Sequence, residues 1–281
     1  MARAEERSNF LLQLLKDVKI HGSERSFKVL DGLLLRNRFL LGVSKRSIGQ
    51  TPDDTIVGIC QRMGMPQVLS RRFKQKLPDV NFVLFGFEEN EKTCVYKVYL
   101  EFYDKFPEHV KGRSNAHDPF LMHLGFKWDA FDNARSAEAR YTWYPMLSVR
   151  NILPRMSGVY EDSRYRPSGE IAEKIFKIAS TRMTRKDILY LEVAEENNSR
   201  RSYDINLYEA NLRLRDLGSI VPEVCRSYSI SPEEFGRFYE GVADERLGHL
   251  AGGIDREGRD FLTIYYEVMG IPSMFAALKP A

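Results

Sequence analysis

Segments that alternate apolar and polar residues come in pairs along this chain, and segments with helical spacing separate one pair from the next. The clearest pair is 81–87 with 94–103, joined by a short polar turn. In another pair, 247–253 with 261–268, Gly258 stands in the turn at a position that favours a positive φ. Three more pairs follow the pattern: 188–194 with 202–208, 120–129 with 140–146, and 27–30 with 34–43. This arrangement predicts ten antiparallel strands.

The segments between the strand pairs carry helix signals. Ser231 begins a capping box, Ser-Pro-Glu-Glu, and Ile171, Ile175 and Ile178 form an apolar stripe at helical spacing. Ten antiparallel strands with helices in their connections favour a sheet that closes on itself, because closure removes unpaired edges. We therefore expect an α+β fold, a closed ten-stranded antiparallel β-barrel surrounded by helices in repeated ααββ units. No linker rich in Pro, Gly or Ser divides the chain, which predicts one domain over 1–281.

Composition excludes several classes of protein. The 281 residues are 43% hydrophobic and 29% charged, enough to bury a core, and the net charge of +3 argues against a nucleic-acid partner. The sequence has no run of about 18 apolar residues of the kind that spans a membrane. The three cysteines have no C-x-x-C spacing, which favours a reducing compartment over a disulfide framework or a zinc site. We expect a cytoplasmic monomer.

Polar residues in the predicted strands gather on one face. Alternation places Lys97, Tyr99 and Glu101 together, opposite Val98 and Leu100. The same reasoning groups His123 with Lys127, Tyr190 with Glu192, and Asp204 with Tyr208. An open sheet with its polar face in water is the common explanation of such a pattern. Tyrosine, however, combines a large apolar body with a polar tip and suits a partly dry cavity. Five tyrosines recur on the predicted polar face: Tyr99, Tyr144, Tyr190, Tyr208 and Tyr265.

Several short motifs, in this order, resemble those of the soluble aromatic prenyltransferases with the ABBA, or PT-barrel, fold. Tyr96-Lys97-Val98-Tyr99 is similar to the lysine-x-tyrosine pair of that family, in which the lysine binds diphosphate and the tyrosine shields an allyl cation. Residues 140–144 resemble a strand of the family in which polar residues and a tyrosine alternate. Tyr190 falls where another shielding tyrosine stands, and 253–258 resembles the turn of the last hairpin.

The resemblance implies a transferase that moves a prenyl group from an allylic diphosphate to an electron-rich aromatic acceptor. The leaving diphosphate needs converging cations, for which the candidates are Arg36, Arg38, Lys97, Lys127, Arg140 and Arg201. The rings of the five tyrosines are candidates for shielding the cation. A base or an acceptor anchor is expected among Glu101, Glu192, Asp204 and His123.

The resemblance also bears on metal. Some members of the family bind magnesium through an aspartate on the second strand of the first hairpin, where this chain reads Arg36-Asn37-Arg38. This favours the branch that needs no metal and has prenyl diphosphate only as a co-substrate.

Other interpretations remain open at the level of sequence. Each basic residue could be an ordinary surface charge, and each tyrosine could be plain core. A non-catalytic barrel that encloses a hydrophobic or aromatic small molecule would need the tyrosines but not the cations. A nucleic-acid module on an exposed sheet is a third interpretation, which the near-neutral charge disfavours. The acceptor, the prenyl length and the regiochemistry are not specified by the sequence.

Overall fold

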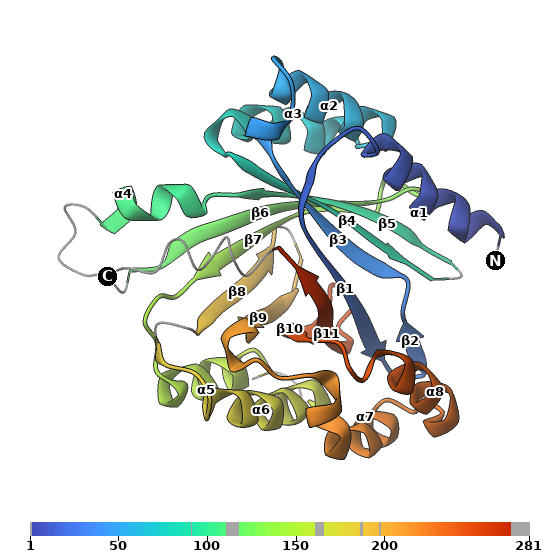
Figure 1. Cartoon of the computed structure of the whole chain (residues 1–281), viewed down its shortest axis with the longest axis vertical. Coiled ribbons are helices and arrows are strands. Elements are labelled where there is room, and N and C mark those ends of the chain that lie inside the picture. The colour runs from blue at the N-terminus through green and yellow to red at the C-terminus, as the bar shows by residue number, and fades with distance from the viewer. Residues whose placement is uncertain are drawn as a thin grey trace.

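A closed barrel forms the centre of the computed structural model, which describes residues 2–90, 92–110, 118–160, 166–185, 188–196 and 198–270 (Figure 1). The strands are β1 Ile20–Leu30, β2 Leu33–Leu35, β3 Arg38–Ser44, β4 Phe82–Glu89, β5 Cys94–Glu101, β6 Phe120–Asp129, β7 Ser136–Trp143, β8 Leu189–Glu195, β9 Arg201–Asn206, β10 Leu247–Ile254 and β11 Asp260–Met269. The α-helices are α1 Ala2–Leu14, α2 Pro52–Arg62, α3 Gln67–Lys76, α4 Phe106–Val110, α5 Val149–Gly158, α6 Pro167–Ser180, α7 Val221–Ser227 and α8 Pro232–Val242.

The ring consists of ten antiparallel strands. It runs from β1 through β3 and then in chain order to β11, which pairs back with β1. Short β2 pairs with the far end of β1, beyond the stretch that pairs with β3, so β2 and β3 together act as one interrupted neighbour of β1. The closing pairing joins Phe27 to Ile264 and Val29 to Leu262. The predicted closed ten-stranded barrel is confirmed.

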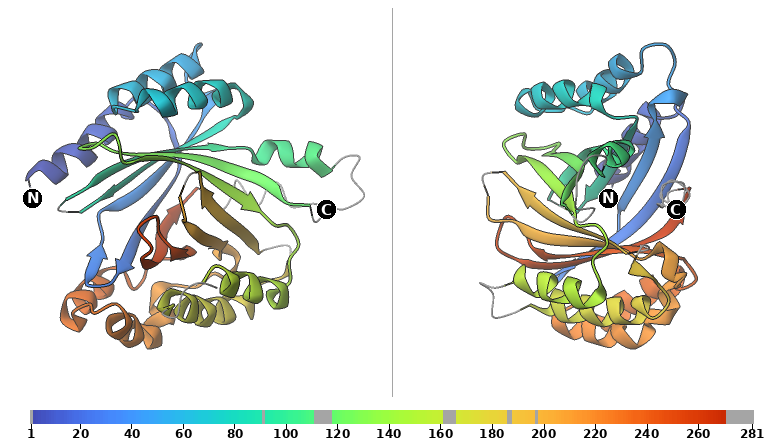
Figure 2. Two further views of the ribbon diagram at one scale, coloured as in Figure 1. Left: turned by 180° about the vertical axis from the view of Figure 1, so that it is seen from behind. Right: turned by 90° about the vertical axis from the view of Figure 1, so that its left-hand side faces the viewer.

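Helices cover the barrel in two groups. Helices α1 to α3 lie over one side of the ring, and α5 to α8 lie over the opposite side (Figures 1 and 2). The first group packs on β4, β5 and β6 through a cluster that includes Phe73, Phe126 and Trp128. The second group packs on β1 and β8 to β11 through a cluster that includes Ile171, Tyr190 and Leu262. The hydrophobic core is therefore a layer between helices and barrel. The described residues contain no helix that combines the length and the hydropathy needed to cross a membrane.

The two faces of each strand follow from this layering. On β5, Tyr96, Val98 and Leu100 point outward and are completely buried under the helices. Lys97, Tyr99 and Glu101 alternate with them and line the lumen, as predicted.

Strand β8 reverses the predicted assignment. Leu191 pairs directly with Asp204 of β9, so the two share the lumen face. Tyr190 and Glu192 therefore point outward, where Tyr190 joins the core under α5 to α8 and Glu192 accepts a hydrogen bond from Arg155 Nε of α5 at 2.7 Å. The prediction that these two residues face the lumen is wrong. The outer face here carries a tyrosine and a glutamate because a helix supplies them with partners.

Several predicted strand boundaries also shift, among them those of β1 and β7. β1 begins at Ile20, seven residues before the predicted start. β7 ends at Trp143, whereas the prediction extended to Met146. The chain leaves the sheet there because Pro145 has no N–H to donate, and Met146 has a φ of 59°.

Removing the Phe73 ring should destabilise the fold. Phe73 on α3 is 1% exposed and packs edge to face on Phe126, with ring centroids 5.3 Å apart. We expect Phe73→Ala to lower the free energy of unfolding by about 3–5 kcal/mol, measured by chemical denaturation. Val68→Ala on the same helix, where Val68 is 73% exposed, is the control and should change it by less than about 0.5 kcal/mol. Equal effects of the two changes would contradict this packing.

Candidate active site

The barrel encloses one continuous lumen with a wide and a narrow part. We call the wide part, of about 1030 Å³, the outer chamber and the narrow part, of about 100 Å³, the inner chamber. Hairpin turns such as 255–259 border the outer chamber. The two chambers meet at residues that line both: Arg38, Lys97, Tyr99, Tyr141, Asp204 and Tyr265.

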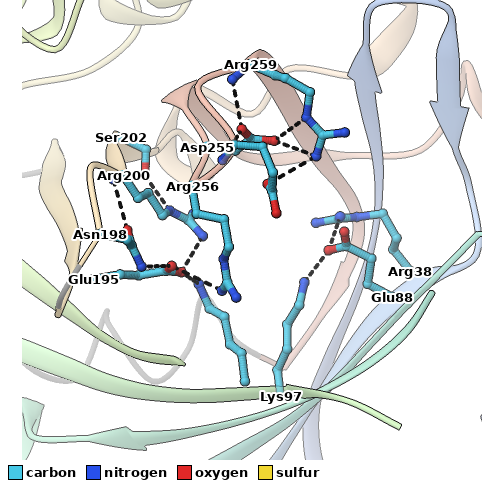
Figure 3. Close-up of polar contacts among 12 residues, drawn as sticks. Arg38, Glu88, Lys97, Glu195, Asn198, Arg200, Ser202, Asp255, Arg256 and Arg259 are labelled. Carbon is cyan, nitrogen blue, oxygen red and sulfur yellow. Dashed lines mark hydrogen bonds and ion pairs between the residues drawn. The ribbon is translucent and has the colours of Figure 1, made fainter. Parts of the chain in front are cut away.

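Three cations surround Glu88 in the lumen, and Figure 3 shows two of them, Arg38 and Lys97. Arg38 and Lys97 both form ion pairs with Glu88 Oε2, and Lys28 of β1 lies close enough to be attracted to the same carboxylate. Arg38 Nε also donates to Ser26 Oγ at 3.1 Å. Burial alone would raise the pKa of Glu88, but the cations outweigh burial and hold it well below its usual value. We call Glu88, Arg38, Lys97 and Lys28 the Glu88 cluster.

A second carboxylate in the lumen has the same kind of surroundings. Glu195 Oε1 accepts from Lys127 Nζ at 3.2 Å and from Arg200 Nη1 at 2.8 Å, and Arg256 Nη2 lies 3.1 Å from Oε2 (Figure 3). Burial would raise the pKa of Glu195, but these cations lower it below the ordinary range. We call Glu195, Lys127, Arg200 and Arg256 the Glu195 cluster.

The two clusters meet at a pair of like charges. Lys97 and Lys127 are direct cross-strand partners on β5 and β6, and their side chains are only 13% and 7% exposed. Like charges directly opposite each other destabilise a sheet. Burial, partly offset by Glu88, lowers the pKa of Lys97 to about 7, and burial with the nearby Arg200 lowers that of Lys127 well below its usual value. This wall is therefore built to receive negative charge.

Tyrosine rings stand at the junction of the two chambers. Tyr99 packs edge to face on Tyr141, with centroids 5.6 Å apart. Gly125 of β6 lies directly opposite Tyr99, and a Cβ there would come within 2.8 Å of the Tyr99 ring. Glycine thus lets the ring lie over the strand. The ammonium group of Lys127 lies 5.7 Å from the centre of the Tyr141 ring.

A buried histidine organises the inner chamber. His249 of β10 lies with Nδ1 2.7 Å from Asp204 Oδ1 and Nε2 3.0 Å from Glu24 Oε1. Burial lowers the pKa of His249, but the two carboxylates outweigh it and raise the pKa to about 10, so the imidazole is charged at neutral pH. The His249 ring stacks on the Tyr265 ring, with ring centroids 3.6 Å apart. The Tyr208 hydroxyl donates a hydrogen bond to Glu24 Oε2 at 3.0 Å.

A second acid–histidine pair lines the inner chamber. Glu101 and His123 are cross-strand partners on β5 and β6, with Oε2 and Nδ1 3.8 Å apart. Burial, with a smaller contribution from Asp104, raises the pKa of Glu101 to about 8. Burial and His249 lower the pKa of His123 to about 3. Both groups are therefore uncharged at neutral pH. Within the described part of the chain, no three His, Cys, Asp or Glu side chains are placed to hold a metal ion.

Nine predicted site residues come together in the lumen. They are Arg38, Lys97, Tyr99, Glu101, His123, Lys127, Asp204, Tyr208 and Tyr265. Their roles in catalysis stay predictions, but their common placement follows from strand alternation on β5, β6, β9 and β11.

Six others do not join them. Arg140 is exposed on the outer face of β7, because its neighbour Tyr141 shares the lumen face with Val193. Tyr144, like Tyr190, packs outside, where the guanidinium of Arg155 lies 3.8 Å from the centre of its ring. The lumen placements predicted for Arg140, Tyr144, Tyr190 and Glu192 are wrong.

The two remaining arginines are also displaced. Arg201 is exposed and points outward, because Ser202 and Asp204 face inward on β9. Arg36 lies half exposed at the rim of the outer chamber, 3.6 Å from Glu234 of α8, and does not belong to the Glu88 cluster.

Sequence reasoning missed eight lumen residues, Glu24, Lys28, Glu88, Tyr141, Glu195, Arg200, His249 and Arg256. Arg200 could have been predicted from alternation, because it is separated from Asp204 by an even number of positions and so points to the same face of the strand. Glu24 and Lys28 lie on β1 in a common alternating row, but the predicted strand began too late to include Glu24. Nothing in β7 marked Tyr141, since its inward neighbours Ala137 and Ala139 are not polar.

Comparison of the sequence with protein-family models and with curated proteins finds no match. Solved structures do match. A 6-dimethylallyl tryptophan synthase has a TM-score of 0.59 at 12% identity, covering 95% of this chain and 93% of that one. The 5-dimethylallyl tryptophan synthase of Streptomyces coelicolor, in complex with DMASPP and Trp, has a TM-score of 0.58 at 12% identity, covering 92% and 81%. This chain has the ABBA prenyltransferase fold.

A third structure agrees. The 6-dimethylallyltryptophan synthase of Micromonospora olivasterospora, in complex with DMASPP and Trp, has a TM-score of 0.56 at 14% identity and covers 87% of this chain and 81% of its own. The resemblance drawn from short motifs is thus confirmed at the level of the fold. At identities of 12–14% these likenesses concern the fold.

The raised pKa of Glu101 predicts how stability depends on pH. Above about pH 4.5 this carboxyl ionises in the unfolded chain but stays protonated in the fold up to about pH 8, so it makes the fold less stable as pH rises. We expect Glu101→Gln to gain stability relative to the unsubstituted protein between pH 5 and pH 8, by about 1–3 kcal/mol in chemical denaturation. Glu108→Gln on α4, where Glu108 is exposed, is the control. A difference that does not change with pH would show that Glu101 ionises normally.

Proposed function

We propose that this protein is an aromatic prenyltransferase, which moves a prenyl group from an allylic diphosphate to an electron-rich acceptor. One observation carries the proposal: six cations, in two clusters, line a closed lumen beside tyrosine rings. Such an arrangement matches the chemistry of a leaving diphosphate and a carbocation. Two structures of the same fold hold DMASPP and Trp, a diphosphate analogue and an aromatic acceptor.

The diphosphate is expected at the Glu88 cluster. Arg38 and Lys97 lie where the two chambers meet, next to the rings of Tyr99 and Tyr141. A diphosphate ester carries about three negative charges, which the ammonium and guanidinium groups can meet with charge-assisted hydrogen bonds. Because the cations are already held in place by Glu88, little reorganisation is needed when charge builds up on the leaving group.

The reaction then follows in three steps. The allylic C–O bond breaks, and its electron pair leaves with the diphosphate. The allyl cation is covered by the π faces of Tyr99, Tyr141 and Tyr265 and is trapped by a π electron pair of the acceptor. The alkylated ring restores its aromaticity by losing a proton from the same carbon. Asp204 and Glu24 are the carboxyl groups that His249 contacts in the inner chamber, and we assign proton acceptance to this pair.

A non-catalytic barrel for neutral aromatic molecules accounts less well for the lumen. Burying charged side chains is costly, and a neutral ligand gains nothing from six cations. The lumen lies within one chain, so we also propose that a monomer is active. The three cysteines are free and buried, which fits the cytoplasm.

The proposed function is tested by incubating the protein with C5, C10 and C15 allylic diphosphates and a panel of indoles, phenols and phenazines, with products identified by mass spectrometry. We expect a product heavier than its acceptor by one prenyl unit and the release of one diphosphate. Ligand binding without any product would favour the non-catalytic barrel.

Lys97→Ala should reduce turnover by about a hundredfold, roughly the loss when one preorganised electrostatic contact is deleted. The contact strengthens as charge moves onto the diphosphate, so kcat should fall more than acceptor affinity. Tyr99→Phe should cost much less because the ring survives. Arg140→Ala, on the outer face of β7, is the matched control and should retain turnover. Unchanged turnover in a folded Lys97→Ala variant would place the diphosphate elsewhere.

Turnover should survive EDTA. We infer this because lysine and arginine side chains already supply the positive charge that an ion would bring to the diphosphate, and Arg36-Asn37-Arg38 stands where the resemblance puts an ion-binding acid. Initial rates with EDTA and with added magnesium should agree within about twofold. A rate that depends strictly on added magnesium would contradict the assignment to a metal-independent branch.

A further inference from the structure

One carboxylate of the protein occupies the place where the proposed function puts the diphosphate. Glu88 Oε2 forms ion pairs with both Arg38 and Lys97, the two cations expected to hold the leaving group (Figure 3). A diphosphate oxygen that reaches the same guanidinium and ammonium groups would lie next to this carboxylate. Two anions side by side in a site shielded from water repel each other strongly. Glu88 and the diphosphate therefore compete for the same cations.

The Glu88 carboxylate is held less firmly than that of Glu195. The side chain of Glu195 is 0% exposed, and both of its oxygens are contacted, Oε1 by two cations and Oε2 by Asn198 at 3.0 Å and Arg256 at 3.1 Å. The side chain of Glu88 is 16% exposed and lines the outer chamber. Among the described residues, its ion-pair partners all meet it at Oε2. Glu88 is thus the carboxylate that a ligand can displace.

Arg38 has a second anchor besides Glu88. Its Nε donates to Ser26 Oγ at 3.1 Å, a hydrogen bond that remains when Glu88 withdraws. Arg38 is 5% exposed, yet its Nη1 has no hydrogen-bond acceptor among the described residues, because its contact with Glu88 is an ion pair without hydrogen-bond geometry. A buried donor without an acceptor is costly, and a phosphate oxygen would satisfy it. The guanidinium group is therefore placed to exchange Glu88 for a phosphate.

Building on the proposed function, we propose that Glu88 is an internal competitor of the diphosphate, which promotes release of inorganic diphosphate after the transfer. In the free protein Glu88 pairs with Arg38 and Lys97. It withdraws from them when the allylic diphosphate binds, and it returns to them as the product leaves. No covalent bond to Glu88 forms or breaks, so Glu88 acts through the two cations that it releases and reclaims.

Product release explains why a carboxylate belongs among these cations. Inorganic diphosphate carries at least as much negative charge as the ester from which it comes. Cations that stabilise the leaving group therefore also retain it once the allylic C–O bond has broken. A carboxylate that reclaims the cations weakens the binding of the product without removing the positive charge that the reaction needs.

The test measures the affinity of inorganic diphosphate itself, by calorimetry in buffer free of divalent metal. We expect Glu88→Gln to bind it at least about tenfold more tightly than the unsubstituted protein does, because the amide keeps the shape of the side chain but not the competing charge. Loss of a merely structural residue would weaken binding, so the direction of the change separates the two roles. Added inorganic diphosphate should also become a correspondingly stronger inhibitor of prenyl transfer.

Glu89→Gln is the matched control. Glu89 follows Glu88 on β4 and also lines the outer chamber, but its Oε2 accepts a hydrogen bond from Asn37 Nδ2 at 2.9 Å. The control removes one carboxylate from the same chamber without freeing Arg38 or Lys97. The affinity for inorganic diphosphate should therefore change by less than about threefold.

A crystal structure of the unsubstituted protein with inorganic diphosphate gives a second measurement that does not depend on the folding of a variant. We expect Lys97 Nζ to contact a phosphate oxygen and the Glu88 carboxylate to have moved away from Lys97. Equal or weaker affinity in a folded Glu88→Gln variant, or Glu88 still paired with both cations beside the bound anion, overturns the proposal and leaves the proposed function standing. Absence of diphosphate binding in both proteins would overturn the proposed function as well.

Discussion

Closure of the sheet between β1 and β11 is the constraint on which the rest of the structure depends. The pairing of Phe27 with Ile264 and of Val29 with Leu262 turns one face of ten strands into an interior. Polar side chains that would lie in water on an open sheet are thereby enclosed, and the apolar face must find its cover outside. Helices provide that cover, which is why the hydrophobic core surrounds the barrel and the charged residues lie within it.

An interior of this kind has to neutralise its own charges. Glu88 and Glu195 act as internal counterions, each holding cations that would otherwise repel one another across β5 and β6. The pairs do not cancel, because each carboxylate faces more than one cation. The lumen thus keeps an excess of positive charge while its side chains stay fixed in position, the condition under which electrostatic stabilisation of a leaving group is most effective.

Most of the site could be predicted where a strand alternates cleanly. Lys97, Tyr99 and Glu101 were placed correctly because they alternate with apolar residues. Those apolar residues, Val98, Leu100 and Phe102, are buried in the core outside the barrel, so the polar residues face the lumen. Alternation assigned the wrong face of β8 to the lumen. The apolar residues Leu189, Leu191 and Val193 line the lumen. Tyr190 and Glu192 point outward, where they contact side chains of other elements. Polarity alone does not tell inside from outside when both faces of a strand are buried.

The sequence by itself determined the order of strands and helices, the closed ten-stranded sheet and the row from Lys97 to Glu101, since hairpin turns, caps and alternation are local signals. Only the tertiary structure decided which cations converge. Lys28, Arg200 and Arg256 come from β1 and from the turns next to β9 and β10, and what unites them with Glu88 and Glu195 is the register between strands far apart in the chain. Register depends on pairing across the whole ring, and a shift of one residue decides that Arg200 and not Arg201 faces the lumen.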